Sequence, residues 1–267
     1  MKKAFIKEYF DITNKSFLIT GANGKLGTNF VEFLSNFKIK LILTDKFFEK
    51  KKIIKFQKIC KKNKIQLKII DCDFSNNKDR EKLISNLKNT KIDVIINNAT
   101  YTSRSKHYFS KFKFQNVSEW KKIFEVNLTT VFDLVKELQP CLKKSKKPSI
   151  INIASIYGIR GPDWEIYNNT EMGNPAVYAI SKAGIIQLTR WLANTLAPKI
   201  RVNSITLGGI FRNQPKSFVK KYKDKTPLKR MAIEKDVNGA ILYLSSNLSN
   251  YVTGANLVID GGISTKI

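Results

Sequence analysis

Three polar side chains in the middle of the 267-residue chain have the types and spacing of a proton-transfer site. Tyr178 and Lys182 are four positions apart, so a helix places them on one face, one turn from each other. An ammonium group beside a phenol favours the phenolate, and we therefore expect the pKa of Tyr178 to fall from about 10 toward the working pH. Such a phenol can exchange a proton with a substrate oxygen while a hydride moves to or from the carbon, and the Ser155 hydroxyl can hold that oxygen.

A glycine-rich turn near the start of the chain has the pattern of a dinucleotide-phosphate site. Residues 20–27 read TGANGKLG and join an apolar run to a helical pattern. Glycines at this place allow a tight turn and a close approach of the backbone to a pyrophosphate, whose oxygens bind the amide groups at the helix N-terminus. The residues expected to contact the cofactor here are Gly21, Asn23, Gly24, Lys25 and Leu26.

An acidic residue stands where the second apolar run ends. Asp45 follows the glycine-rich turn by about 20 residues, where a carboxylate accepts hydrogen bonds from the adenosine ribose and repels a 2′-phosphate. The sequence therefore predicts NAD(H) as the cofactor in preference to NADP(H). The neighbouring Lys46 carries a positive charge that offsets part of this preference.

The elements that must position these side chains alternate between short apolar runs and longer helical patterns. Several runs are continuous and β-branched, as in parallel strands buried on both faces. The predicted strands are 16–20, 40–44, 66–70, 92–97, 149–154, 200–205 and 256–259. Long helices are predicted over 119–142, with Ser118 as N-cap, and over 176–196, after Pro175. The pattern predicts an α/β fold of one domain, a Rossmann-type doubly wound parallel sheet of about seven strands.

The whole chain, 1–267, is interpreted as one NAD(P)-binding domain whose core covers residues 16–262. Two long polar and aromatic loops, 100–117 and 158–175, interrupt the alternation of strands and helices. Both follow the carboxyl ends of predicted strands, where open α/β sheets bind their ligands. We therefore expect both loops to contact the substrate.

The net charge of +27 suggests at first a nucleic-acid-binding protein. However, only seven of the 48 basic residues are Arg, the side chain best suited to bidentate phosphate and base recognition. The Lys residues are spread along the chain together with abundant Asn and Ile, which indicates a general bias in composition. The sequence therefore predicts no specific nucleic-acid partner.

Three Cys and one His exclude a disulfide framework and an ordinary zinc site, so no metal is expected. The first fifteen residues, MKKAFIKEYFDITNK, lack the apolar stretch of a secretory signal. No uncharged apolar run approaches the ~18 residues of a membrane span. These features predict a cytoplasmic protein without a membrane partner, in which Cys60, Cys72 and Cys141 are inert thiols.

Taken together, these motifs resemble those of the short-chain dehydrogenases/reductases, over about residues 16–262. Besides the glycine-rich turn, the resemblance rests on Asn127 and on the Tyr178/Lys182 pair. The other matching segments are 72–75 (CDFS), 97–99 (NNA), 153–155 (IAS), 201–203 (RVN), 252–254 (VTG) and 260–262 (DGG). So many matches in the same order make a chance coincidence implausible.

The resemblance implies a role for each matching residue. Tyr178 is then the acid/base, and Lys182 tunes it while binding the nicotinamide ribose. Ser155 positions the substrate, and Asn127 supports a water-linked proton path through Lys182. The resemblance further implies that the cofactor contacts Asp73, Phe74, Asn98, Ala99, Gly208 and Ile210. It also implies a homodimer or homotetramer formed through the two long helices.

The chain departs from the family pattern at several places. Its glycine spacing, TGxxGxxG, is similar to that of the longer branch, which contains nucleotide-sugar epimerases and dehydratases. Thr100 replaces a usual Gly, and residues 207–210 (LGGI) replace a usual Pro-Gly start. Arg212 stands where a Thr often contacts the cofactor.

The loops after the strands predict the kind of substrate. They carry many Asn, Asp, Glu, Trp and Tyr side chains, which suit a polyhydroxylated ring. Arg160 and Arg212 can pair with a phosphate or carboxylate, and Trp164 can pack on a sugar face. The 158–175 insert also resembles that of bacterial members of surface-sugar and nonulosonic-acid pathways. His107, in the first loop, is expected to be solvated.

The predicted function is NAD(H)-dependent interconversion of a secondary alcohol and a ketone on a polar or anionic sugar-like small molecule. Three alternatives stay open. The first is a 3-oxoacyl-acyl-carrier-protein-type ketoreductase, although the loops are polar for an acyl tunnel. The second is a nucleotide-sugar epimerase/dehydratase, which the glycine spacing favours and the short C-terminal part disfavours. The third is a non-catalytic nucleotide-binding protein.

Overall fold

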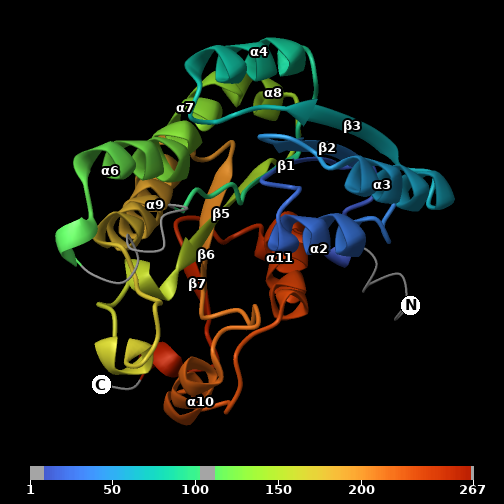
Figure 1. The fold of residues 1–267 in the computed structure, drawn as a ribbon. Coiled ribbons are helices and arrows are strands. Elements are labelled where there is room, and N and C mark those ends of the chain that lie inside the picture. The colour runs from blue at the N-terminus through green and yellow to red at the C-terminus, as the bar shows by residue number, and fades with distance from the viewer. Residues whose placement is uncertain (1–8, 103–111, 266–267) are drawn as a thin grey trace.

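A computed structural model describes residues 9–102 and 112–265. Within these residues the strands form one seven-stranded sheet in the order β3-β2-β1-β4-β5-β6-β7, and all neighbouring strands are parallel (Figure 1). The strands are β1 (Ser16–Thr20), β2 (Lys40–Asp45), β3 (Gln66–Asp71), β4 (Val94–Asn97), β5 (Ser149–Ser155), β6 (Arg201–Leu207) and β7 (Asn256–Ile259). The predicted single-domain Rossmann-type sheet of about seven strands is confirmed.

The central strands form because their residues are apolar on both faces. Every residue of β1 and β5 is buried, as expected of parallel strands covered on two sides. In the register of the sheet, Leu18 of β1 lies between Ile42 of β2 and Ile95 of β4. Several bounds differ from those predicted: β4 begins two residues later, and β6 extends to Leu207 at the edge where the ligand-binding loops start.

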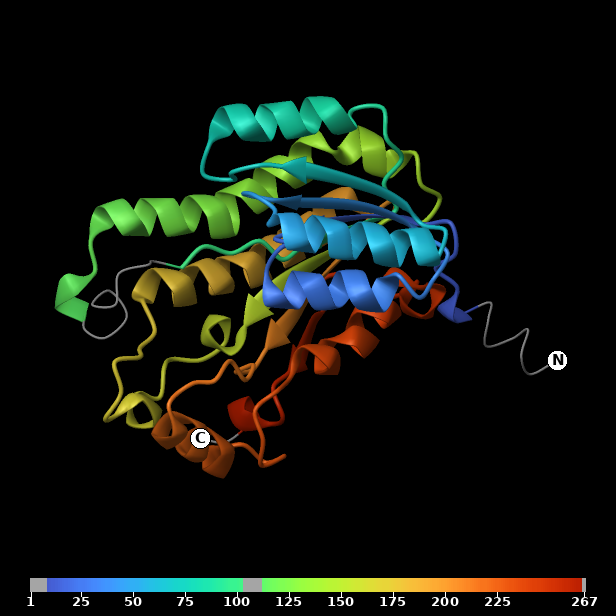
Figure 2. The same ribbon diagram turned by 45° about the vertical axis from the view of Figure 1, so that its right-hand side comes forward.

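Helices cover both faces of the sheet (Figure 2). One hydrophobic core joins the sheet to α2, α3 and α11, and a second core joins its other face to α4, α7, α8 and α9. The helices are α2 (Lys25–Leu34), α3 (Lys50–Lys62), α4 (Asn77–Leu87), α6 (Val117–Phe124), α7 (Thr130–Glu137), α8 (Gln139–Lys143), α9 (Ala176–Leu196), α10 (Lys216–Lys225) and α11 (Asn238–Ser245). The predicted helix after Pro175 is confirmed as α9.

The single helix predicted over 119–142 was wrong. A π-helical segment, Glu125–Thr129, separates α6 from α7, and α7 ends before α8, which has Pro at its start. Pro cannot continue a helix because it lacks the N–H donor and its ring clashes with the preceding turn. The predicted N-cap, Ser118, lies inside the first turn; the cap is Asn116, whose side chain accepts a hydrogen bond from the Glu119 N–H at 2.9 Å.

No helix among residues 9–102 and 112–265 is long and apolar enough to cross a membrane. The same residues contain no cluster of three or more His, Cys, Asp or Glu side chains able to hold a metal ion.

Candidate active site

A cleft of about 1000 Å³ runs along the carboxyl ends of the strands. The glycine-rich turn lines one end, and Ser155, Tyr178 and Lys182 line the other. All the predicted cofactor residues lie on its wall, namely Gly21, Asn23, Gly24, Lys25, Leu26, Asp45, Asp73, Phe74, Asn98, Ala99, Tyr178, Lys182, Gly208 and Ile210. The sheet thus brings together residues that are far apart in the sequence.

Within the described residues, no side chain caps the N-terminus of α2, which follows the glycine-rich turn. Its N-cap, Gly24, makes no side-chain capping bond, and the first turn of the helix contains no acidic residue. Gly21 has a φ of +66°, and a Cβ on Gly27 would lie 2.2 Å from the Gly21 carbonyl oxygen, so both positions require glycine. The side-chain amide of Asn98 donates to the carbonyls of Thr20 and Gly21 at 3.0 Å each and fixes the turn.

These groups fit a dinucleotide phosphate. Unpaired amide donors and the positive end of the helix dipole favour an anion. The buried side-chain oxygen of Asn23, on the cleft wall, has no hydrogen-bond partner within the described part of the chain. An orphaned acceptor in this position fits a hydroxyl or amide donor from a bound ligand.

Asp45 is held at the end of β2 by backbone donors. Its carboxylate accepts hydrogen bonds from the N–H groups of Asn23 and Lys46, each at 2.8 Å. Burial raises the pKa of Asp45, although these hydrogen bonds and the charge of Lys52 act in the opposite direction. The Lys46 ammonium, expected to offset this charge, is 2.6 Å from the carboxylate of Asp73 instead.

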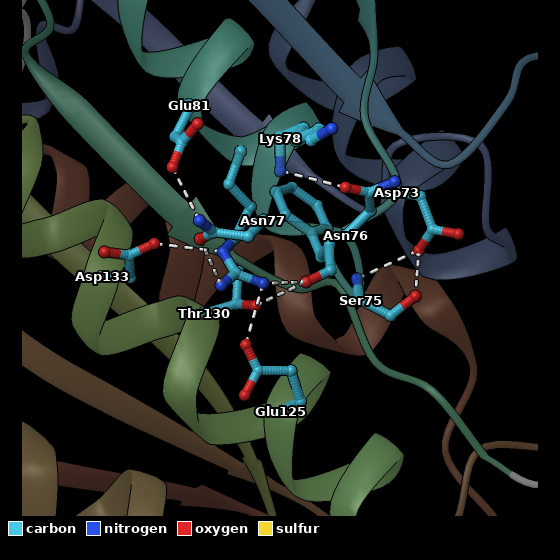
Figure 3. A network of polar contacts seen from close by, with 11 residues as sticks. Asp73, Ser75, Asn76, Asn77, Lys78, Glu81, Glu125, Thr130 and Asp133 are labelled. Carbon is cyan, nitrogen blue, oxygen red and sulfur yellow. Dashed lines mark hydrogen bonds and ion pairs between the residues drawn. The ribbon is translucent and has the colours of Figure 1, made fainter.

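Asp73 belongs to a polar network that joins the cofactor loop to the helices behind it (Figure 3). Burial alone would raise the pKa of Asp73, but hydrogen bonds from Lys46 and Ser75 outweigh it and lower the pKa. Close by, the buried Arg80 guanidinium donates to the Phe74 carbonyl at 2.7 Å.

The same guanidinium contacts the first residue of the π-helical segment and a residue of α7, the helix that follows it. It forms ion pairs with Glu125 at 2.8 Å and with Asp133 at 3.1 Å. Glu125 begins the π-helical segment and Asp133 lies in the first turn of α7 (Figure 3). Arg80 therefore joins the loop below the cofactor end to the segment that carries Asn127.

Tyr178 and Lys182 lie one turn apart on α9 and face the cleft beside β5. The Lys182 ammonium is 5.8 Å from the centre of the Tyr178 ring and donates to the carbonyl of Ile153 at 2.9 Å. Burial lowers the pKa of Lys182 to about 8. The expected fall in the pKa of Tyr178 was wrong for this state of the protein: burial raises it, and the hydrogen bond with Ser155 offsets only part of that rise.

Asn127 is buried in the π-helical segment, behind the cleft wall. Its side-chain oxygen accepts from the Tyr101 N–H at 2.7 Å, and its amide donates to the Ser181 hydroxyl at 3.4 Å. Asn127 therefore joins the loop after β4 to the helix that carries Lys182. π-helical turns are often found at functional sites.

The three predicted substrate residues occupy different places. Arg212 lines the cleft and forms an ion pair with Glu234. Among the described residues, neither Arg160 nor Trp164 lines it. The Arg160 guanidinium donates to the Ile263 carbonyl at 2.7 Å, and Trp164 borders a separate cavity. Their roles toward a substrate stay predictions.

Sequence reasoning missed several aromatic side chains and one methionine at the substrate end. Tyr101, Tyr157, Tyr222, Phe218 and Met231 line the cleft on the side of Ser155 and Tyr178. Of these, Tyr157 could have been predicted from the sequence, because it stands two positions after Ser155. The others come from segments whose approach depends on long-range packing.

The cysteines were expected to be inert thiols. Burial raises the pKa of Cys60 to about 11 and that of Cys72 to about 12, which favours the unreactive thiol. His107, in the loop 100–117, lies outside the described residues.

Comparisons with known proteins identify the family. The family described as Enoyl-(Acyl carrier protein) reductase matches residues 26–264. A 3-oxoacyl-[acyl-carrier-protein] reductase FabG from Buchnera aphidicola is 30% identical over 262 residues, which cover 94% of this chain and 98% of that protein. Post-translational flagellin modification protein A from Campylobacter coli is 40% identical over 128 residues, 48% of this chain and 50% of that protein.

A solved structure agrees with these relatives. The short chain dehydrogenase from Leptospira borgpetersenii with bound NAD+ is 35% identical, with a TM-score of 0.82, and the match covers 97% of this chain and 95% of that one. The chain therefore belongs to the short-chain dehydrogenase/reductase family, and it is an NAD(P)-dependent oxidoreductase.

Proposed function

We propose that the protein interconverts a secondary alcohol and a ketone on a small hydroxylated, sugar-like substrate, with NAD(H) preferred over NADP(H). The observation that carries this proposal is the convergence of Ser155, Tyr178 and Lys182 on one end of a cleft whose other end is the glycine-rich turn. This arrangement leaves room for a dinucleotide between the phosphate-binding turn and the proton-transfer site.

The chain's own residues move the proton. Because the pKa of Tyr178 is raised, its phenol is protonated at neutral pH and acts as the acid in ketone reduction. Ser155 holds the substrate oxygen, and Lys182 stabilises the phenolate that forms when the proton leaves. Asn127 positions α9 and the loop after β4 on either side of the reacting atoms. A bound nicotinamide supplies or accepts the hydride.

The preference for NAD(H) rests on Asp45. Its carboxylate is fixed by two backbone donors on the cleft wall, and Lys46 pairs with Asp73 instead. A 2′-phosphate beside Asp45 would place two anions in contact in a partly buried site, which is unfavourable.

The proposed sugar-like substrate rests on the substrate end of the cleft. Two of the three acidic groups of the insert, Asp163 and Glu165, are paired with Lys225. Tyrosine rings and hydroxyls line the wall instead, and such groups suit the C–H faces and hydroxyls of a small hydroxylated molecule.

A second candidate is reduction of a 3-oxoacyl thioester on an acyl carrier protein. Relatives named for that activity match nearly the whole chain. Phe218 and Met231 add apolar surface to the substrate end of the cleft. The epimerase/dehydratase alternative has no comparable support among the relatives reported above.

The remaining proposals concern assembly and location. Exposed apolar side chains on α7 and α9, among them Phe132, Ile180 and Trp191, support a homodimer or homotetramer formed through these helices. Light scattering coupled to gel filtration tests this. A cytoplasmic location stays a proposal, supported by three free, buried cysteines.

A substrate panel tests the function. Initial rates with NADH and NADPH should be measured on keto sugars, their phosphates, nucleotide-linked keto sugars and acetoacetyl thioesters. We expect the highest kcat/KM with NADH and a hydroxylated ketone. Turnover confined to the thioesters would replace the first candidate with the second, and no turnover with any ketone or alcohol would refute both.

A further inference from the structure

Two phenol hydroxyls meet at the substrate end of the cleft, beside the proton-transfer site. Tyr157 and Tyr167 are hydrogen-bonded to each other through their hydroxyls, and both line the cleft. The Tyr157 N–H donates to the Ser155 hydroxyl at 3.3 Å. The insert therefore supplies Tyr167 to a partner that stands two positions after a predicted catalytic residue.

The pair has hydrogen-bonding capacity to spare. Each phenol carries one proton and can both donate and accept. Their mutual bond uses one proton, so whichever hydroxyl donates, the other keeps a free O–H. Within the described residues, Tyr157 and Tyr167 form no other side-chain hydrogen bond. Because both phenols line the cleft, the free O–H is available to a ligand that supplies an acceptor.

Packing fixes the pair before any ligand binds. The ring centroids of Tyr167 and Phe218 are 5.4 Å apart, and those of Phe218 and Tyr222 are 5.9 Å apart. The Tyr222 hydroxyl accepts a hydrogen bond from the Gly209 N–H at 2.5 Å. The insert lies against α10, which carries Phe218 and Tyr222, in both views (Figures 1 and 2). A donor held in this way loses little entropy when it binds a substrate.

Both phenols stay protonated over the neutral range. Burial is the main cause that raises the pKa of Tyr157 and of Tyr167, and the nearby Tyr178 adds to both rises. All three phenols line the same cleft, and the Tyr157 backbone is hydrogen-bonded to Ser155, so a substrate at the proton-transfer site also lies beside the pair.

We propose that Tyr157 and Tyr167, the tyrosine pair, bind a second oxygen of the substrate, on the carbon next to the reacting carbonyl or one carbon further. This inference rests on the proposed function and specifies which ketones the same site prefers. A hydroxyl fits best, because it accepts from the free O–H and donates to a phenol oxygen. The pair takes no part in hydride or proton transfer; it favours ketones that carry the second oxygen over ketones that lack it.

Three small ketones test the inference with NADH: 3-hydroxy-2-butanone, 4-hydroxy-2-butanone and 2-butanone. The wild type should reduce at least one hydroxyketone with a kcat/KM about tenfold or more above that of 2-butanone, as for the loss of one good hydrogen bond. Tyr167→Phe and Tyr157→Phe should each reduce this ratio about fivefold or more, and leave kcat/KM for 2-butanone within about twofold. Tyr243→Phe on α11, outside the cleft, is the matched control and should keep the ratio.

The outcomes separate selectivity from structure and from the function itself. Equal losses on all three ketones would show that the phenols only support the fold, and an unchanged ratio in both variants would also overturn the inference. A wild type that reduces 2-butanone as well as the hydroxyketones would overturn it directly. If no ketone in this set or in the wider panel is reduced, the proposed function fails and the inference fails with it.

Discussion

The two ends of the cleft are built in different ways. The cofactor end is built on backbone, namely the carboxyl ends of β1 and β2, the glycine-rich turn and the N-terminus of α2, to which Asp45 and Asp73 add carboxylates. The substrate end is formed by side chains from the insert and α10, which ion pairs hold together across 60 or more residues of sequence. The first end is part of the sheet core, whereas the second is attached to it.

This difference indicates where the protein can vary. A backbone turn enclosed by the sheet tolerates few changes, because a Cβ on Gly21 would lie 2.8 Å from the Cα of Ala99. The insert depends on partly exposed contacts such as those between Lys225 and Asp163. We therefore expect substitutions at the cofactor end to affect folding and cofactor choice, and substitutions at the substrate end to affect selectivity.

The largest expected effect on stability comes from Arg80, which joins the cofactor loop to the π-helical region. Arg80→Met leaves Glu125, Asp133 and the Phe74 carbonyl without their shared donor. Because the partner carboxylates are partly exposed, we expect a loss of about 3 kcal/mol in unfolding free energy, at the low end for a broken buried pair. Urea denaturation measures it. Arg190→Met, which removes an exposed guanidinium that donates to Gln187, is the control; equal small losses would show that the network contributes little.

The pH dependence of stability tests the environment of Lys182. Below pH 8 this lysine is charged in both the folded and the unfolded state, so the cost of burying its charge is fully present. Between about pH 8 and pH 10 the folded state releases the proton while the unfolded state keeps it, so this cost declines and stability rises.

Lys182→Met removes that titration. Its unfolding free energy should exceed that of the wild type by about 2 kcal/mol below pH 8, and the difference should shrink toward pH 10. Urea denaturation at a series of pH values measures the difference. A difference that stays constant over this range would contradict a lowered pKa for Lys182.

The choice of cofactor is expected to respond to one charge. Asp45→Asn keeps the shape of the side chain but removes the repulsion toward a 2′-phosphate, so the NADH-to-NADPH ratio of kcat/KM should fall about tenfold. Asp71→Asn is the matched control, because Asp71 is the register partner of Asp45 on β3 and does not line the cleft. If Asp71→Asn lowers the NADH-to-NADPH ratio as much, the effect comes from the change in the protein's net charge and not from the position of Asp45.

The smallest expected effect concerns the attachment of the insert. Lys225→Met removes two ion pairs that are partly exposed, so kcat/KM for the ketone should fall about threefold while the KM for the cofactor stays the same. Lys223→Met, at an exposed position on the same helix, should change neither quantity. A rise in cofactor KM with Lys225→Met would show that the two ends of the cleft are not independent.

The difference between the two ends of the cleft also determines how much of the fold and of the site could be predicted from the sequence. The strands, the glycine-rich turn and the Tyr178/Lys182 spacing depend on local pattern, and each was recognisable from the residues. The break at the π-helical segment was not, because the contacts of Asn127 with Tyr101 and Ser181 are long-range. The polar insert was expected to bind the substrate through its charged groups, but Asp163 and Glu165 are paired with Lys225.

The central claim is that Tyr178 transfers the proton at a site whose cofactor end is independent of it. Tyr178→Phe removes only the hydroxyl, so turnover of the best ketone should fall about 1000-fold, within the range for a lost general acid. The dissociation constant for NADH, measured by fluorescence titration on the same preparation, should stay within about twofold of the wild type. An unchanged turnover rate would contradict the account, because another group would then supply the proton.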